Sequence, residues 1–318
     1  MLLALLLLLS LFSLTLSLML GSVAIEPHEL AALLWGNATP LTQSLVLELR
    51  LPRTLLAFLS GAMLALAGAL MQVLLRNPLA EPYILGISGG AGFATLLAMM
   101  AGLSGLWLTG SAFIGALLST ILVFGLARRG SGWTPTRLLL TGVVIAMGWG
   151  ALISFILTIA PEQQLRGMLF WLMGDLSYGQ MPYSGGIILI IALTFTLPYA
   201  RELNIMTRGE LQAGALGVQV NTMRLRIYLT SSLLAAAAVV QVGSIGFVGL
   251  VVPHLLRLLG CQDHRLLLPA CLLLGGSLLV LADTIARTLI APEQLPSGII
   301  TALIGVPLFL YLLGRQYR

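Results

Sequence analysis

Continuously apolar runs of about 20 residues recur along the chain, and short charged segments separate them. The clearest run, residues 54–75, carries no charge and lies between ELRLPR (48–53) and RNPLAEP (76–82). A helix of that length extends about 33 Å, which matches a hydrocarbon core of about 30 Å. Strands of a membrane barrel would alternate apolar and polar residues, and these runs do not alternate. The pattern therefore predicts transmembrane helices.

The same pattern extends over the whole chain, which we expect to form one all-α, polytopic membrane domain over residues 1–318. Residues 84–127 carry no charge and are too many for one crossing, so we expect a turn at Gly102 and Gly105. The first run lacks the charged start of a signal peptide, so we expect it to be retained, with a cleaved signal peptide as the alternative. The expected spans are about 1–20, 54–75, 84–103, 106–127, 138–160, 185–200, 226–244, 247–260, 266–288 and 297–314.

The arginines indicate the orientation. With both termini in the cytoplasm, ten spans place twelve arginines inside and four outside, a strong positive-inside bias. Treating residues 227–256 as one tilted span would reverse every later loop, so we expect two spans with a break near Gly243, Gly246 and Gly249. The inner arginines are Arg76, Arg128, Arg129, Arg137, Arg201, Arg208, Arg224, Arg226, Arg257, Arg265, Arg315 and Arg318; the outer ones are Arg50, Arg53, Arg166 and Arg287.

Composition supports the membrane assignment and excludes several functions. The chain is 58% hydrophobic and 8% charged, whereas soluble domains carry about 25% charged residues. All sixteen basic residues are arginine, and a Walker A phosphate loop requires lysine, so the chain lacks a standard ATP site. Cys261 and Cys271 have no metal-site spacing. We expect no nucleic-acid binding, no cofactor and no catalytic activity, because no catalytic set of residues is present.

Two segments between spans are expected to form surface helices. Residues 163–178 are too short and too charged to cross the membrane, and their aromatic residues suit the membrane interface. Residues 201–226, RELNIMTRGELQAGALGVQVNTMR with its flanks, form the longest inner segment. Their mixed charges and glycines predict two short helices on the cytoplasmic face.

An ordered series of motifs resembles the FecCD-type permeases, the membrane subunits of type II ABC importers for iron–siderophore complexes, haem and cobalamin. The resemblance covers about residues 46–314. The matching motifs are RLPR (50–53), GALMQ (68–72), RNPLAEP (76–82), LGISGGA (85–91), RLLLTG (137–142), GFVGLVVPHLLR (246–257), DHR (263–265), ADTIAR (282–287), LPSG (295–298) and GVP (305–307).

The resemblance implies roles for residues at both faces. Arg50, Arg53 and Arg287 would meet glutamates of a periplasmic substrate-binding protein; for Arg287, an i,i+4 pair with Asp283 is the alternative. Thr134, Pro135 and Thr136 would close the cytoplasmic mouth of the pore. A coupling segment would contact an ATP-binding subunit through Thr207, Gly209, Glu210, Ala213, Gly214, Leu216 and Gly217, although a solvated loop would explain these residues equally well.

Other side chains suggest chemistry only weakly. Asn77, Pro78 and Pro82 end the second span, since proline interrupts a helix. His254, Cys261 and His264 could ligate haem or a metal ion. We expect instead that His254 packs against its neighbours, because tight ligation would trap a transported chelate, and we expect no metal site.

The sequence therefore predicts a permease subunit in the bacterial inner membrane that imports an iron–siderophore, haem or cobalamin chelate. The expected partners are a pair of ATP-binding subunits, a periplasmic binding protein and a second copy of the chain. The fifth span and the helix at 163–178 are expected to line the pore. The alternative is a secondary transporter driven by an ion gradient, which would need intramembrane carriers such as Asp283 or Asp175.

Overall fold

The structure, a computed structural model, describes residues 1–128, 134–177 and 181–316, with backbone only for residues 34 and 312–316. Arg129, Tyr178 and Arg318 lie outside this part. The elements are α1 (Leu2–Met19), α2 (Pro27–Leu34), α3 (Pro40–Gln43), a π-helix η1 (Ser44–Arg50), α4 (Leu51–Leu75), η2 (Pro82–Leu85), α5 (Ile87–Met100), α6 (Leu106–Ala127), α7 (Pro135–Ile159), α8 (Glu162–Leu172), α9 (Tyr183–Thr196), η3 (Leu197–Tyr199), α10 (Ala200–Met206), α11 (Glu210–Ala215), α12 (Val220–Val242), α13 (Val248–Leu258), α14 (His264–Thr288) and α15 (Ser297–Gln316).

Seven helical segments in the described residues are long and apolar enough to cross a membrane, and α5, α13 and α15 are shorter apolar helices. This confirms the expected all-helical, polytopic membrane fold. Each of the ten apolar runs contains one of these helices. However, α5 has 14 residues and α13 has 11, so they extend only about 21 Å and about 16 Å. A full crossing at either helix would need non-helical segments as well, so ten full crossings stay a prediction.

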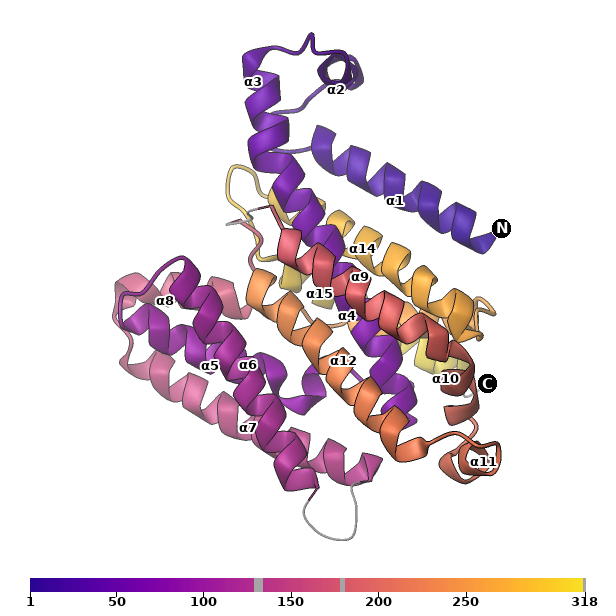
Figure 1. Cartoon of the computed structure of the whole chain (residues 1–318). Coiled ribbons are helices and arrows are strands. Elements are labelled where there is room, and N and C mark those ends of the chain that lie inside the picture. Colours follow the sequence, from indigo (N-terminus) through magenta and orange to yellow (C-terminus); the bar gives the residue numbers. More distant parts are fainter. Residues whose placement is uncertain (129–133, 178–180, 317–318) are drawn as a thin grey trace.

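Helix α4 lies at the centre of the bundle, packed against α12, α13 and α14 (Figure 1). Small residues allow this close packing. A Cβ atom on Gly61 would overlap the carbonyl of Gly275 in α14, and one on Gly68 would overlap the carbonyl of Gly249 in α13. In a membrane, where apolar burial gives helices little reason to associate, such backbone contact supplies the van der Waals attraction that joins them.

The expected break in residues 227–256 is confirmed. Helix α12 ends at Val242, and both Gly243 (φ 71°) and Phe247 (φ 70°) have left-handed backbone conformations. Glu81, from the RNPLAEP motif, accepts a 2.8 Å hydrogen bond from the Phe247 amide and so satisfies one of the free N–H groups that begin α13. The prediction of two short spans was inexact, because α12 has 23 residues and α13 only 11.

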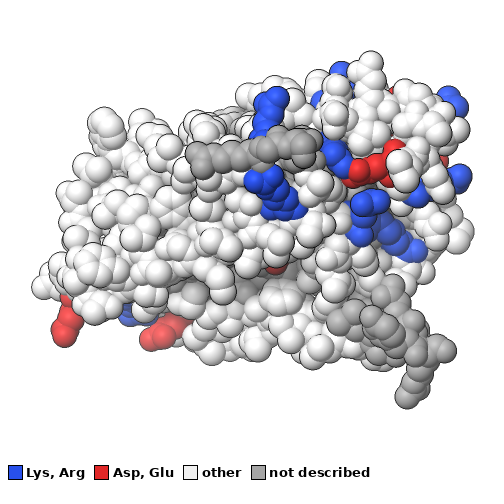
Figure 2. Space-filling model, turned by 90° about the horizontal axis from the view of Figure 1, so that it is seen from below, with Lys and Arg blue, Asp and Glu red and all other residues white. Residues whose placement is uncertain are grey.

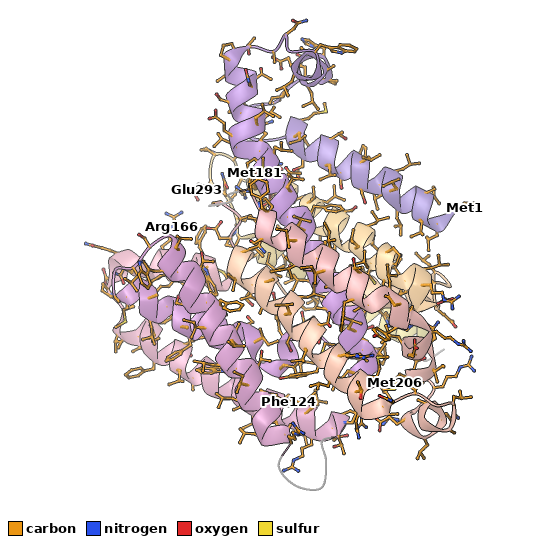
Figure 3. All side chains as sticks on the ribbon, in the orientation of Figure 1. Met1, Phe124, Arg166, Met181, Met206 and Glu293 are labelled. Atoms are coloured by element: carbon orange, nitrogen blue, oxygen red, sulfur yellow. The ribbon has the colours of Figure 1, made fainter. Side chains whose placement is uncertain are left out.

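Most of the described arginines lie at one end of the helical bundle. In Figure 3, Met206 and Phe124 mark this end, and Arg166 and Glu293 mark the opposite end. Figure 2, seen from below, shows arginines gathered over the half of the molecule that carries α10, α11 and the start of α12. We call it the arginine-rich end; its described arginines are Arg76, Arg128, Arg137, Arg201, Arg208, Arg224, Arg226, Arg257 and Arg265.

Candidate partner-binding sites at the two ends of the bundle

At the opposite end, Arg53 of α4 is paired with Asp283 of α14. The guanidinium donates from Nε to Asp283 Oδ2 at 3.0 Å and from Nη2 to Oδ1 at 2.8 Å. Both side chains are largely buried, with 11% of Arg53 and 1% of Asp283 exposed. Arg53 Nη1 also donates to Gln294 Oε1 at 2.6 Å, and Ser297 donates to Asp283 at 2.8 Å.

Arg50 and Arg287 are also buried, and they bind the last turn of α1. Arg50 Nη1 donates to the carbonyls of Leu18 (2.8 Å) and Met19 (2.9 Å), and Nη2 donates to the carbonyl of Val23. Arg287 Nη2 donates to the carbonyl and the hydroxyl of Ser17. The last carbonyls of a helix have no partners within the helix and carry partial negative charge, so the two cations cap α1.

These contacts constrain the docking role expected for the three arginines, which stays a prediction. A carboxylate of a partner would have to displace Asp283 from Arg53, or a backbone carbonyl from Arg50 or Arg287. The alternative pair between Asp283 and Arg287 is present but long, with 3.9 Å between Nε and Oδ2. The Arg53–Asp283 pair could not be predicted from the sequence, because its members lie 230 positions apart.

At the arginine-rich end, α10 and α11 form the expected pair of short helices, and an ion pair fixes α11 to α12. Arg224 donates from Nε to Glu210 Oε1 at 3.1 Å, and its Nη2 contacts Oε2. This hydrogen bond lowers the pKa of the Glu210 carboxyl below its ordinary value, despite the opposing effect of partial burial. The carboxylate is therefore charged at neutral pH.

The seven predicted coupling residues all lie within this turn–helix–turn. Gly209 (φ 119°) and Gly217 (φ 84°) bracket α11 with backbone conformations that other residues rarely adopt. Thr207 Oγ1 donates to the Asn204 carbonyl at 2.7 Å, Ala213 is buried, and Gly214 and Leu216 are exposed. Sequence reasoning missed Leu211, whose side chain is 93% exposed. Its signal was an apolar residue beside Glu210 in a charged segment.

Thr134, Pro135 and Thr136 start α7. The Thr134 hydroxyl accepts a hydrogen bond from the Arg137 amide at 3.3 Å, and Pro135 occupies the first helical position. Both are favoured at the start of a helix. The expected gate role stays a prediction, because these contacts describe a helix cap only.

His254 and His264, near the two ends of the loop after α13, contact different residues. His254 is buried and makes an edge contact with Phe309, with 5.8 Å between ring centroids. His264 Nδ1 lies 2.6 Å from Asn204 Oδ1. Within residues 1–128, 134–177 and 181–316, no three His, Cys, Asp or Glu side chains are grouped as a metal site would need.

Comparisons with known proteins agree with this arrangement. The model of the FecCD transport family matches residues 6–315. The hemin transport system permease protein HmuU of Yersinia pestis is 42% identical over 303 residues, which cover 89% of this chain and 87% of that protein. The vitamin B12 import system permease protein BtuC of Yersinia enterocolitica is 40% identical over 309 residues, which cover 96% and 90%.

A solved structure, an inward-facing metal-chelate type ABC transporter, superposes with a TM-score of 0.87 at 32% identity and covers 98% of both chains. The superposition covers 98% of the chain, so it includes residues 201–226 and the buried arginines at the opposite end of the bundle. The resemblance found in the sequence is thereby confirmed. The chain belongs to the FecCD transport family and is a multi-pass inner-membrane permease of an ABC importer, whose ATPase activity lies in separate subunits.

Proposed function

We propose that this permease imports a bulky metal chelate of the haem, cobalamin or iron–siderophore class. The observation that carries the proposal is the superposition on a metal-chelate type transporter over 98% of the chain. HmuU is named for hemin and BtuC for vitamin B12, and both cargoes are metal ions chelated by a large macrocycle. The cargo common to these relatives is therefore the class that we assign to this chain.

The translocation path lies between two copies of the chain, with α7 and α8 along its wall. Only Pro135, Leu138, Gly142 and Ile156 of α7 are buried within one copy. The remaining face combines exposed apolar side chains, such as Met147 and Phe155, with small or weakly polar residues. The hydroxyls of Ser154 and Thr158 donate to their own helix backbone. Such a lining would pass a large ligand without holding it.

Each end of the bundle receives one kind of partner. The coupling segment at the arginine-rich end contacts the ATP-binding subunits, with Leu211 and Leu216 as its exposed apolar residues. The periplasmic binding protein docks at the opposite end, over Arg50, Arg53 and Arg287. Arg53 is the centre of that surface, because its partner Gln294 is exposed and a carboxylate could replace it.

Reconstituted transport tests the proposal. Proteoliposomes would contain the permease, its ATPase subunits and its binding protein, and uptake of hemin, cobalamin and a ferric siderophore would be measured with and without ATP. We expect ATP-dependent uptake of one chelate, and none with an ATPase that cannot hydrolyse ATP. Uptake driven by an ion gradient without ATP would establish the secondary transporter instead. That alternative needs a free carboxylate carrier, whereas Asp283 is engaged by Arg53.

A further inference from the structure

A polar cleft of about 400 Å³ opens beside the coupling segment, between α10, the turn after α11 and the first turns of α12. This volume lies within the range of small-molecule sites, about 300–1,000 Å³. The aromatic, charged and hydroxyl side chains in its lining include Tyr199, Arg201, Glu202, Thr222 and Arg226.

Two cations in the cleft suit a phosphate group. The Arg226 guanidinium lies 4.4 Å from the centre of the Tyr199 ring, so a cation–π contact holds it in place. Arg201 of α10 also lines the cleft and is exposed. A planar guanidinium presents paired donors that match phosphate oxygens, and Thr222 adds a hydroxyl donor.

The carboxylate of Glu202 is the third charged group in the cleft, and it would accept a hydrogen bond from a ligand. Glu202 lines the cleft, and its Oε2 atom is buried without a hydrogen-bond partner. A carboxylate oxygen removed from water without a partner is costly, so an added donor near it is stabilising. A ligand with a phosphate and a primary ammonium group would satisfy both the arginines and Glu202.

An apolar crevice continues from the cleft between α9 and α12. Tyr199, Met223 and Arg226 line both spaces, and Phe195 and Ile227 line only the crevice. At this level both helices change from charged to apolar: Arg201 follows the apolar α9, and Ile227 begins the apolar part of α12 after Arg226. The cleft therefore lies at the depth of lipid headgroups. The crevice itself, of about 10 Å³, has room for a single water molecule and not for an acyl chain.

We propose that this cleft binds a phospholipid whose headgroup carries a primary amine, such as phosphatidylethanolamine. The phosphate contacts Arg201 and Arg226, the ammonium group contacts Glu202, and the acyl chains stay in the bilayer beside α9, where Phe195 is exposed. Basic pockets between transmembrane helices are a known form of lipid recognition. The bound lipid would brace α10 against α12, the two helices that hold α11, and so link the membrane to the coupling segment.

Lipid retention by the purified permease with its ATPase subunits tests the site. After delipidation, the complex would be titrated with phosphatidylethanolamine, phosphatidylcholine or phosphatidylglycerol and examined by native mass spectrometry. Phosphatidylcholine keeps the phosphate but cannot donate a hydrogen bond from its quaternary amine. We expect about tenfold tighter binding of phosphatidylethanolamine than of either other lipid, since a charged hydrogen bond distinguishes them.

Three variants separate the contacts. Arg226→Gln should lower the affinity of the complex for all three lipids about tenfold. Glu202→Gln, of nearly the same size, should remove only the preference for phosphatidylethanolamine. Arg265→Gln, an exposed arginine of the same end outside the cleft, is the matched control and should change nothing.

Four results would overturn the proposal. Equal binding of the three lipids by the unaltered chain would exclude recognition of the amine. An equal loss in Arg265→Gln would show general electrostatic attraction only. Displacement of the lipid by soluble glycerophosphoethanolamine would show that the site takes a free headgroup. Loss of the ATPase chains from the Arg226→Gln complex with unchanged lipid retention would assign the cleft to the ATPase interface.

Discussion

Arg53 and Asp283 form a buried, two-pronged ion pair that joins α4 to α14 at the end of the bundle opposite the arginine-rich end. Its two shortest contacts are 2.8 Å and 3.0 Å, and Ser297 at the start of α15 donates a further hydrogen bond to the carboxylate. Since α4 is the central helix, this pair fixes the position where α14 and α15 meet the core. The same arginine is the one expected at the centre of the docking surface. In this structure, however, its charge is paired with Asp283 inside the permease.

Asp283→Asn should destabilise the permease strongly. The substitution leaves the Arg53 and Arg287 cations in a buried site without their carboxylate, and breaking a buried ion pair in this way costs about 3–5 kcal/mol. Thermal unfolding in detergent should show a fall of about 10 °C in melting temperature. Glu293→Gln, an exposed acid at the same end, is the control and should leave the melting temperature unchanged. A melting temperature equal to that of the unaltered chain would contradict the structural role of the pair.

Arg50→Lys should loosen the end of α1 while the rest of the bundle stays folded. The guanidinium contacts the carbonyls of three residues at once, and a single ammonium group cannot reach all three. Loss of one charged hydrogen bond corresponds to about a tenfold faster opening, measured by amide hydrogen exchange over residues 17–25. Arg166→Lys is the control, because Arg166 lies on α8, away from α1. Unchanged exchange in Arg50→Lys would show that α1 is held by its packing alone.

Much of the fold was predictable because hydrophobic runs and charge follow one simple constraint, the bilayer. The run at 106–127 coincides with α6, and the break near Gly243 followed from the need to keep Arg257 and Arg265 with the other inner arginines. What the pattern could not reveal was that α5 and α13 are short. An uncharged segment is compatible with helix or with buried extended chain, and the choice at Phe247 depends on Glu81, which is distant in sequence.

The sequence allowed candidate site residues to be chosen, but it did not show their contacts. The predicted coupling residues could be chosen because charged, glycine-rich segments are rare in so apolar a chain, and their role stays a prediction. The contacts of Arg50 and Arg287 with α1 could not be foreseen, because backbone carbonyls leave no signature in a sequence. Leu211 was missed for the opposite reason: an apolar residue is common here, and only its exposure makes it informative.

Leu211→Ala should weaken the attachment of the ATPase subunits. Leu211 is almost fully exposed on α11, where a partner groove would bury it, and truncation of a central apolar contact commonly costs about 1–2 kcal/mol, or about tenfold in affinity. Co-purification and titration of the ATPase with the detergent-solubilised permease would measure the loss. Leu266→Ala is matched in chemistry and lies at the same end with a 52% exposed side chain. Equal affinity of the two variants would remove Leu211 from the interface.

The Glu210–Arg224 pair should make the stability of the permease fall on acidification. Because Arg224 lowers the pKa of Glu210 in the folded chain, the stability that this carboxylate contributes is complete above its ordinary pKa of 4.5 and is lost as the pH falls through the lowered value.

Glu210→Gln should therefore lower the melting temperature by about 2 °C at neutral pH, the effect of about 1 kcal/mol in a chain of this size. The difference between the two proteins should stay constant down to about pH 5 and shrink below it. Thermal unfolding across this range, with Glu293→Gln as the control, measures the difference directly. A difference that stayed the same below pH 5 would mean that the contact with Arg224 does not depend on the charge of Glu210.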